Sequence, residues 1–267
     1  MENTFNISVI LPLKTMKTKD FVDFFTRSID SLKNQKTTPN EVLIVHTEEK
    51  DLIEFLSSFD FGNLNVKMIK HAGEPSFATQ INLGIKESSS QWISFMEFDD
   101  EYSPIWFNNV QKYSEIYSDV EGFMPIVIDV DNKLNFLGFT NEATFAANFA
   151  QEVGFLTNEM LHNYQNFQTS GMVIKKSTLS EFGGFKESMV LTFVYEFLLR
   201  MTYNSVKIMT IPKVGYKHLN FRPESIFWDY KFSESRLSEN EIKFWLTTAK
   251  KEYFFVEDRK IKYTEAV

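Results

Sequence analysis

The chain of 267 residues contains no cysteine, which excludes disulfide bonds and metal sites built from thiolates. It also lacks a long hydrophobic run, because the apolar stretch from Ile7 to Leu13 is too short to span a bilayer and contains a proline. The first residues, Met1 to Thr4, have neither the basic region nor the apolar core of a signal peptide. We therefore expect a cytoplasmic protein without a transmembrane segment.

Positive charge is also scarce. The chain has 28 lysines and arginines against 36 aspartates and glutamates, a net charge of -8, and an isoelectric point near 5.2. A surface of that sign repels phosphate backbones, so we expect no nucleic-acid partner. An acidic protein that binds an anionic ligand needs a metal ion or a few well-placed cations.

Apolar and aromatic residues are plentiful, at 43% and 16% of the chain, and aromatic and β-branched cores favour sheets. In the amino-terminal part, short apolar runs alternate with segments of helical periodicity. Strands are expected at 7–12, 41–45, 65–69 and 92–96, and helices at 21–32, 51–59 and 77–88, with Asp20 as a cap and Pro39-Asn40 as a turn. This alternation predicts an α/β fold with a doubly wound sheet flanked by helices.

Beyond Pro104 the pattern is less regular. We expect a helix at 105–117, a hairpin of strands 123–128 and 134–139, strands at 171–174 and 207–211, and a helix at 190–203. Ser238 and Glu241 have the spacing of a capping box that opens a tail helix at 242–253.

An acidic cluster, Glu97-Phe98-Asp99-Asp100, directly follows the fourth predicted strand. Ligands of doubly wound sheets bind beyond the carboxyl ends of the strands. If the extended geometry persists, Glu97 and Asp99 face one side and Asp100 turns away. Several carboxylates together are best tolerated around a cation, and oxygen ligands suit magnesium or manganese. A solvated acidic turn at a strand end is the alternative interpretation.

Several motifs occur in the same order as in a known family. They are Ser8-Val-Ile-Leu-Pro12, Ser31-Leu32 with Gln35, Glu41 to Val45, Asn82-Leu-Gly84-Ile85, the acidic cluster, Gly171 to Lys176, and Phe182-Gly-Gly-Phe-Lys-Glu187. The set resembles family 2 glycosyltransferases of the GT-A fold over roughly residues 6 to 225. The resemblance implies a GT-A-like mixed sheet and a metal-dependent enzyme. Such an enzyme moves a sugar from a nucleotide-diphospho-sugar, most often UDP-linked, to a hydroxyl acceptor such as a saccharide.

The resemblance also implies roles for matched positions. Asp99 corresponds to the aspartate that binds the diphosphate-bridging ion, Mn²⁺ or Mg²⁺, with Asp100 as a helper. Glu97 replaces the aspartate that contacts the ribose. Five further residues fall in the matched donor-binding motifs: Leu11, Pro12, Leu13, Asn82 and Phe98. His46 stands where the family has an acidic residue that reads the base, and a satisfied histidine at a strand end is its other interpretation.

A late segment, Tyr216-Lys217-His218 followed by Arg222 and Ser225, is similar to the family's Tyr-Arg-x-His-x-x-Ser loop, one residue out of register. The resemblance implies that a histidine there can complete the metal shell or touch the diphosphate, so His218 is a candidate third ligand. An imidazole ligand would favour manganese over magnesium. Lys217 and Arg222 are candidates to neutralise phosphate charge, or they are ordinary surface cations.

The general base of the expected inverting reaction is not obvious. Alignment on Arg200 places Phe193 and Val194 where the family has an acidic pair, and neither accepts a proton. Glu196 is the nearest carboxylate and the first candidate; its alternative is an i,i+4 ion pair with Arg200. Glu187, at the end of the Gly-Gly motif, is the second candidate.

Two further features stay open at the sequence level. Asp129-Val-Asp131 looks like a second metal motif, but it lies at the predicted hairpin turn, where aspartate serves turn geometry. Aromatic residues that could stack on a sugar or belong to the core are Trp106, Phe107, Phe136, Phe139 and Trp228.

The predicted organisation is a donor-binding half at 1–105, an acceptor and catalytic half at 106–228, and a C-terminal helical extension at 229–267. Two other functions compete with the transferase. One is a catalytically silent nucleotide-sugar-binding protein, favoured by the missing acidic pair. The other is an interaction module in which the tail helix, with Phe244, Trp245, Phe254 and Phe255, docks on a membrane or forms a homodimer.

Overall fold

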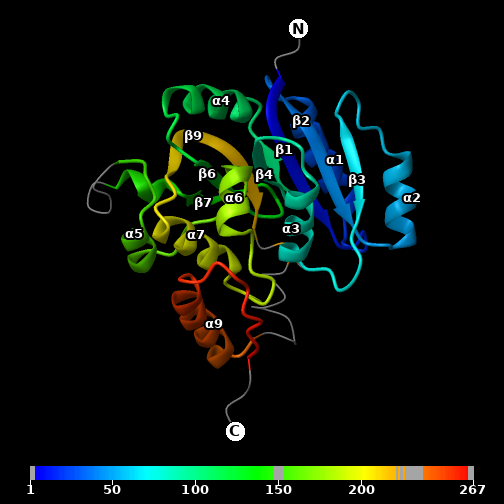
Figure 1. Ribbon diagram of the computed structural model, residues 1–267. Coiled ribbons are helices and arrows are strands. Elements are labelled where there is room, and N and C mark those ends of the chain that lie inside the picture. Colours follow the sequence, from blue (N-terminus) through cyan, green and yellow to red (C-terminus); the bar gives the residue numbers. More distant parts are fainter. Residues whose placement is uncertain (1–3, 147–152, 221, 223–224, 226–236, 264–267) are drawn as a thin grey trace.

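The computed structural model describes residues 4–146, 153–220, 222, 225 and 237–263 (Figure 1). Its centre is one mixed nine-stranded sheet with the order β3-β2-β1-β4-β8-β6-β9-β5, and β7 pairs with β6. The strands are β1 Thr4–Leu13, β2 Thr38–His46, β3 Val66–Lys70, β4 Trp92–Phe95, β5 Glu101–Tyr102, β6 Gly122–Val130, β7 Phe136–Thr140, β8 Val173–Lys175 and β9 Ile208–Leu219. Strands β1 to β4 are parallel to one another, whereas β8 runs antiparallel to both β4 and β6.

Helices cover both faces of this sheet (Figure 1). They are α1 Phe21–Lys33, α2 Lys50–Ser58, α3 Phe77–Glu87, α4 Trp106–Ile116, α5 Asn158–Asn163, α6 Lys176–Phe182, α7 Phe193–Tyr203 and α9 Glu239–Glu252, with a 3-10 turn at Glu142–Phe145. Side chains of α1, α2 and α4 share one core with alternate residues of β1 and β2. Side chains of α3, α6, α7 and α9 share a second core with the intervening residues. The predicted doubly wound α/β fold is therefore confirmed.

Two predicted strand boundaries at prolines were wrong. Pro12 does not end the first strand, because β1 continues to Leu13, which pairs with His46. Pro39 and Asn40 do not form a turn but belong to β2, where Pro39 pairs with Phe5. Pro39 lies next to a register shift between Phe5 and Ser8, and proline is compatible with such irregular positions because it has no N–H to donate to the ladder.

The two predicted helix caps had different outcomes. Asp20 precedes α1 as expected, but it has a left-handed φ of 61° and its side chain accepts no capping hydrogen bond. Ser238 caps α9 as expected: its side chain accepts from the N–H of Glu241, and the Glu241 side chain accepts from the N–H of Ser238. The capping box thus fixes the start of the tail helix.

The predicted hairpin is formed by β6 and β7, and its pairing sorts the side chains onto two faces. Asp129 pairs with Gly138 on β7 and with His218 on β9, whereas Ile128 pairs with Phe139 and Lys217. Cross-strand partners share a face of the sheet and neighbours along a strand alternate. Asp129 and His218 therefore lie on one face, and Phe139 and Lys217 lie on the other.

A buried carboxylate, Glu41, ties the amino-terminal ends of several elements together. Its Oε1 accepts from Ser8 Oγ at 2.5 Å, from Ser89 N at 2.6 Å and from Ser89 Oγ at 2.9 Å. Its Oε2 pairs with Lys67 on β3. Burial alone raises the pKa of Glu41, but the bonds from Lys67, Ser8 and Ser89 outweigh it and lower the pKa to about 2. The charged form is thus strongly favoured in the folded protein.

We expect Glu41 to make folding stability fall in acid. Its folded pKa lies below the ordinary 4.5, so its contribution is complete above pH ~5 and is lost between about pH 4.5 and 2, amounting to about 3 kcal/mol. Urea unfolding of the wild type and Glu41→Gln at pH 7 and pH 3 measures it. The stability gap between the two proteins should shrink at pH 3; an equal gap at both pH values contradicts the prediction.

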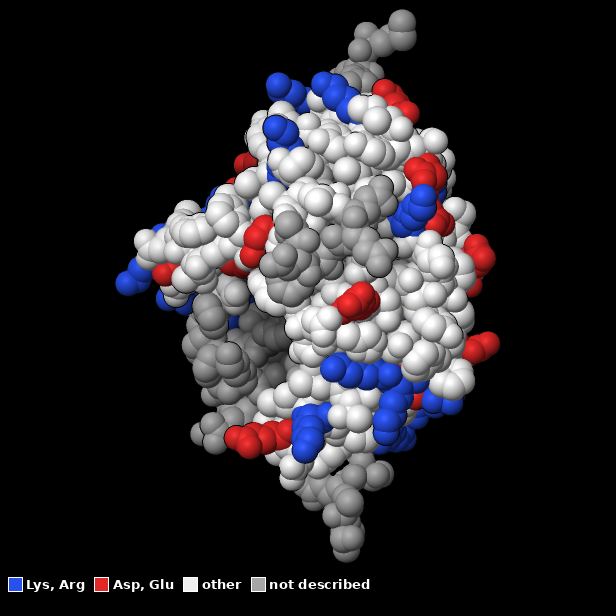
Figure 2. Space-filling model, turned by 90° about the vertical axis from the view of Figure 1, so that its left-hand side faces the viewer, with Lys and Arg blue, Asp and Glu red and all other residues white. Residues whose placement is uncertain are grey.

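The tail helix α9 packs on the body through Trp245 and Ala249, which are buried in the core that α7 lines. Figure 2 shows the side of the molecule that lies at the left in Figure 1. Lysine and arginine side chains gather on the lower part of this side, at the height where Figure 1 places α9 and the segment after it. Phe254 and Phe255 are 49% and 38% exposed, and Arg259 lies over the Phe255 ring.

Among the described residues, none of the helices has the length and apolarity needed to cross a membrane. The sequence-based division of the chain into three parts stays a prediction, since one sheet runs through the first two.

Candidate active site

The acidic cluster lies at the carboxyl end of β4, as expected, but its geometry differs from an extended strand. β4 ends at Phe95, and the N–H of Asp100 donates to the carbonyl oxygen of Glu97 at 3.2 Å. The extended geometry does not persist past Phe95, so the alternation expected for it, with Glu97 and Asp99 together and Asp100 turned away, does not occur. The turn instead brings Asp100 to the side of Glu97, because a reversal of the chain replaces the two-residue period of a strand.

His218, on β9, meets this turn. Its Nδ1 lies 3.0 Å from Oδ2 of Asp100, whose Oδ1 accepts from the N–H of Leu219 at 2.8 Å. Within the described part of the chain, Glu97, Asp100 and His218 form the group with metal-ligating potential, each offering a ligand atom within 4.8 Å of the others. Two carboxylates and an imidazole suit a divalent ion such as manganese.

The neighbours of Glu97 hold it in place. Tyr216 Oη accepts from the N–H of Glu97 at 3.1 Å, and Ser170 Oγ donates to Glu97 Oε1 at 3.2 Å. Tyr216 is itself buried against Tyr102, with ring centroids 4.9 Å apart. The cluster is thus built on rigid elements: β4, β9 and the segment before β8.

The electrostatics of the cluster are those of crowded negative charge. Burial, followed by the charges of Asp100 and Asp99, raises the pKa of Glu97 to about 7 although His218 opposes this. Burial lowers the pKa of His218, but Asp100, by its charge and hydrogen bond, and then Glu97 and Asp129, raise it to about 10. The imidazolium is the local counter-charge, and a divalent cation could replace its proton, so the donor set fits a metal ion.

Asp99 and Arg222 form a separate pair beside the cluster. Arg222 Nε donates to Asp99 Oδ2 at 2.5 Å, and the guanidinium carbon lies 5.0 Å from the centre of the Phe98 ring. Burial and Asp100 raise the pKa of Asp99, and Arg222 opposes that rise. The structure thus does not bring Asp99, the expected principal ligand, into the three-residue group; Glu97 takes its place there.

The residues expected near the base and ribose lie at the carboxyl ends of β1 and β2. Leu11 and Leu13 are buried in the core, and Pro12 pairs with Val45. His46 ends β2, is 8% exposed, and its Nδ1 lies 2.8 Å from the carbonyl oxygen of Thr47. This contact agrees with the satisfied-histidine interpretation, and a base-reading role for His46 stays a prediction.

Lys217 points away from the cluster. It pairs with Glu101 on β5, Nζ to Oε1 at 2.8 Å, on the face of the sheet opposite His218. Contact with the diphosphate is therefore not supported by its position, and the surface-cation interpretation describes it better. Arg222 lies on the cluster's side because it pairs with Asp99.

Asn82 joins α3 to the Gly-Gly motif. Its Nδ2 donates to the carbonyl oxygen of Phe185 at 2.7 Å and to Glu187 Oε1 at 3.0 Å, and its Oδ1 accepts from the N–H of Phe185 at 2.9 Å. A Cβ added at Gly184 would lie 2.1 Å from Asn82 Oδ1, so glycine is required for this close approach. Asn82 acts here as a clamp on the motif, whereas Glu187 is exposed.

The first candidate base, Glu196, is buried in an ion-pair network. Its Oε1 accepts from Arg200 Nε at 2.9 Å and lies 3.3 Å from Lys186 Nζ, and its Oε2 accepts from Arg200 at 3.1 Å. Arg200 in turn donates to the carbonyl oxygens of Gly183 and Gly184. Because Glu196 is 0% exposed, an acceptor hydroxyl cannot reach it, and the ion-pair interpretation describes it.

Sequence reasoning set aside one residue that lines the site, Asp129, and did not foresee the contacts of two others with Glu97. Asp129 was set aside with Asp131 as part of a turn, and only Asp131 behaves so, accepting from the N–H groups of Lys133 at 2.8 Å and Asn135 at 2.9 Å. Asp129 belongs to β6 and pairs with His218. Ser170 directly precedes the motif that begins at Gly171, and Tyr216 opens the late segment with His218. Nothing in the sequence indicated that either of them touches Glu97.

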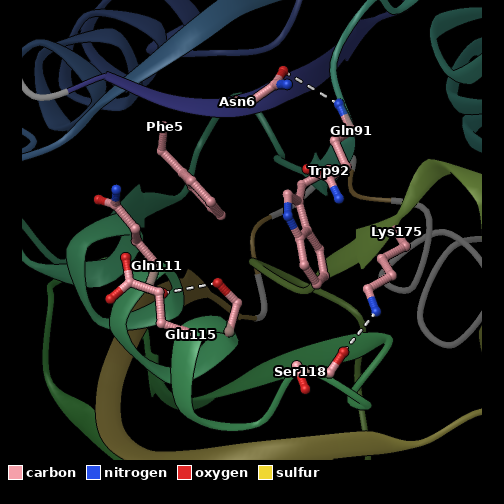
Figure 3. Close-up of a pocket in the computed structure, with 9 residues that line it drawn as sticks. Phe5, Asn6, Gln91, Trp92, Gln111, Glu115, Ser118 and Lys175 are labelled. Atoms are coloured by element: carbon pink, nitrogen blue, oxygen red, sulfur yellow. Dashed lines mark hydrogen bonds between the residues drawn. The ribbon is translucent and has the colours of Figure 1, made fainter.

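A cavity of about 500 Å³ lies elsewhere, at the amino-terminal ends of β1 and β4 (Figure 3). Lys175 extends along Trp92 there, with Nζ 5.6 Å from the ring centre, and donates to the carbonyl oxygen of Ser118. Phe5 and Trp92 are only 7% and 5% exposed, so their rings offer little surface to a ligand. We assign it no role, because ligands of such sheets bind at the opposite ends of the strands.

The segment from residue 8 to residue 171 matches the model of glycosyl transferase family 2. The chain belongs to this family. No curated protein sequence matches it significantly. Among solved structures it is similar to S. aureus TarS 1–349 in complex with UDP-GlcNAc, at 15% identity and a TM-score of 0.65 over 92% of this chain and 65% of that one. The complex of TarS 1–349 with UDP gives 15% identity and a TM-score of 0.60 over 80% of this chain and 60% of that one.

This member of glycosyl transferase family 2 has a GT-A fold and spans less than two thirds of the TarS chains it resembles. The matched family segment includes the acidic cluster and Ser170 but ends before Tyr216, His218 and Arg222. Tyr216 and His218 meet the cluster because β5, which directly follows it, pairs with β9, and Arg222 meets it through Asp99.

Proposed function

We propose that this chain is a metal-dependent, inverting glycosyltransferase that moves a sugar from a UDP-sugar to a hydroxyl acceptor, such as that of a saccharide. The observation that carries the proposal is the group Glu97, Asp100 and His218, at the strand ends where ligands of this fold class bind. Family membership and the likeness to a protein whose structures hold UDP and UDP-GlcNAc support it.

In this proposal Glu97, Asp100 and His218 would hold Mn²⁺ or Mg²⁺, and a bound ion would supply positive charge for the diphosphate leaving group. Arg222 lies beside the same edge and can exchange its contact with Asp99 for a phosphate oxygen. The acceptor oxygen forms the new bond to the anomeric carbon, the bond from that carbon to UDP breaks, and one proton is released. The inverting outcome follows from a single displacement of this kind.

The test is release of UDP from a panel of UDP-sugars by the purified chain, with Mn²⁺ or with EDTA. We expect turnover that needs the metal and that is lost in Glu97→Gln. Tight UDP binding without release across the panel would favour the second candidate, a silent nucleotide-sugar-binding protein. That candidate rests on Phe193 and Val194 standing where an acidic pair is expected, and on the burial of Glu196. Cytoplasmic location and a homodimer stay predictions.

A further inference from the structure

Three strands place one residue each in a row on the site face of the sheet. His218 on β9 pairs with Asp129 on β6, and Asp129 pairs with Gly138 on β7. β7 is paired only with β6 among the described strands, so this row runs from the metal-binding group to an open edge. The row therefore offers a direction in which a second substrate can approach His218.

Polar side chains line this row without interruption. Ser170 Oγ lies 3.2 Å from Glu97 Oε1 and 3.3 Å from Gln168 Oε1, and Gln168 Nε2 lies 3.5 Å from Asp129 Oδ1. Thr140 Oγ1 donates to Asp129 Oδ2 at 2.5 Å and fixes the carboxylate. Carboxylate and amide groups in sequence are hydrogen-bond partners for the hydroxyls of a polyhydroxylated molecule.

Space for such a molecule exists at Gly138. A Cβ placed there meets no atom of the described residues within 4 Å, and the φ of Gly138 lies outside the left-handed region. The missing side chain is thus not explained by crowding or by backbone strain. It leaves the surface open directly across the strand pair from Asp129.

We propose that Asp129 accepts a hydrogen bond from the acceptor hydroxyl and orients it, in a subsite for a saccharide or polyol between His218 and Gly138. This inference rests on the proposed transferase function and names the acceptor side of that site. Asp129 is 8% exposed and is the strand-pairing partner of His218 on β6. Glu196, the first candidate for the general base, is fully buried. The exposed rings of Phe136 and Phe139 lie on the opposite face and take no part.

The test uses the full chain, Mn²⁺, the UDP-sugar of the panel that the wild type turns over fastest, and glycerol and a panel of monosaccharides as acceptors. Asp129→Asn keeps the size of the side chain. We expect its kcat to fall at least about tenfold, because misplacing a reacting group costs that much or more, while the donor KM changes less than about twofold. Asp131→Asn, the same substitution in the exposed turn, serves as the matched control and should behave as wild type.

Gly138→Leu provides a second variant that does not depend on the fold tolerating a change at Asp129. Its side chain enters open space, so the unfolding midpoint should stay that of the wild type while kcat falls with the donor KM unchanged. Lys133→Leu in the turn is its control. Unchanged kcat in both test variants overturns the subsite, as does a parallel rise in donor KM. A wild type that binds UDP with Mn²⁺ yet turns over no donor refutes the transferase itself, and the subsite with it.

Discussion

Asp100→Asn is expected to abolish metal-dependent UDP release, lowering the rate by about 100-fold or more. The substitution removes a ligand charge and leaves one acceptor oxygen for two contacts, with His218 Nδ1 at 3.0 Å and with the N–H of Leu219 at 2.8 Å. Loss of a group that merely orients a metal ligand typically costs 10- to 100-fold, and Asp100 both orients a ligand and belongs to the candidate ligand set. The measurement is UDP release at saturating UDP-sugar over a series of Mn²⁺ concentrations.

Asp119→Asn is the control for this experiment, because Asp119 is an exposed aspartate paired with Lys207 at the surface. It should match the wild type at every Mn²⁺ concentration. Circular dichroism and an unfolding curve establish that Asp100→Asn is folded. Retention of more than half of the wild-type rate in a folded Asp100→Asn protein would rule out this group as the metal site.

Glu196→Gln is expected to lower the free energy of unfolding by about 3–5 kcal/mol, the usual cost of breaking a buried ion pair by removing one partner. Glu196 faces both Arg200 and Lys186, and all three side chains are buried. Arg200 and Lys186 would be left without their counter-charge. Urea unfolding at pH 7 measures the change, with Glu181→Gln, in an exposed position on α6, as the control.

The same variant separates a structural role from a catalytic one. Below its unfolding transition, Glu196→Gln should keep the wild-type kcat per folded molecule, because the side chain does not reach solvent. A kcat reduced more than about 100-fold with unchanged stability would restore Glu196 as the general base, since proton transfer by a positioned side chain contributes that much or more.

The parts of the fold that were predictable are those with local signals. The apolar runs of β1, β2 and β4 and the helical spacing of Phe21, Phe25 and Ile29 in α1 depend on residues close in sequence. The capping box of Ser238 and Glu241 is likewise complete within four residues. The position of the acidic cluster followed from the end of β4 and from the general rule for ligands in such sheets.

The parts that were not predictable depend on contacts between distant segments. The side to which Asp100 points is set by a turn that no residue type in the cluster demands. The environment of Glu196 depends on Lys186, which lies in the segment between α6 and α7 and also donates to the carbonyl oxygen of Glu252 at the end of α9. Asp129 was taken as a turn residue because the predicted strand stopped at Ile128, whereas β6 continues to Val130 through its pairing with β9.

His218 illustrates both sides of this comparison. Its motif was one residue out of register with the family pattern, so the sequence left its ligand role open. In the structure, alternation along β9 places His218 on the face of Asp100 and Lys217 on the other. Because side chains alternate along a strand, His218 and Lys217 face opposite sides of the sheet. Which of the two faces the acidic cluster can be decided only when the pairing of the strands is known.

The most direct measurement of the central claim is a calorimetric titration of the wild-type chain with UDP, once with Mn²⁺ and once with EDTA. The account predicts that UDP binds at least about tenfold more tightly with Mn²⁺, a difference of about 1.4 kcal/mol, and that this gain disappears in Asp100→Asn. Equal affinity of the folded wild type for UDP under both conditions would contradict a metal ion held by Glu97, Asp100 and His218.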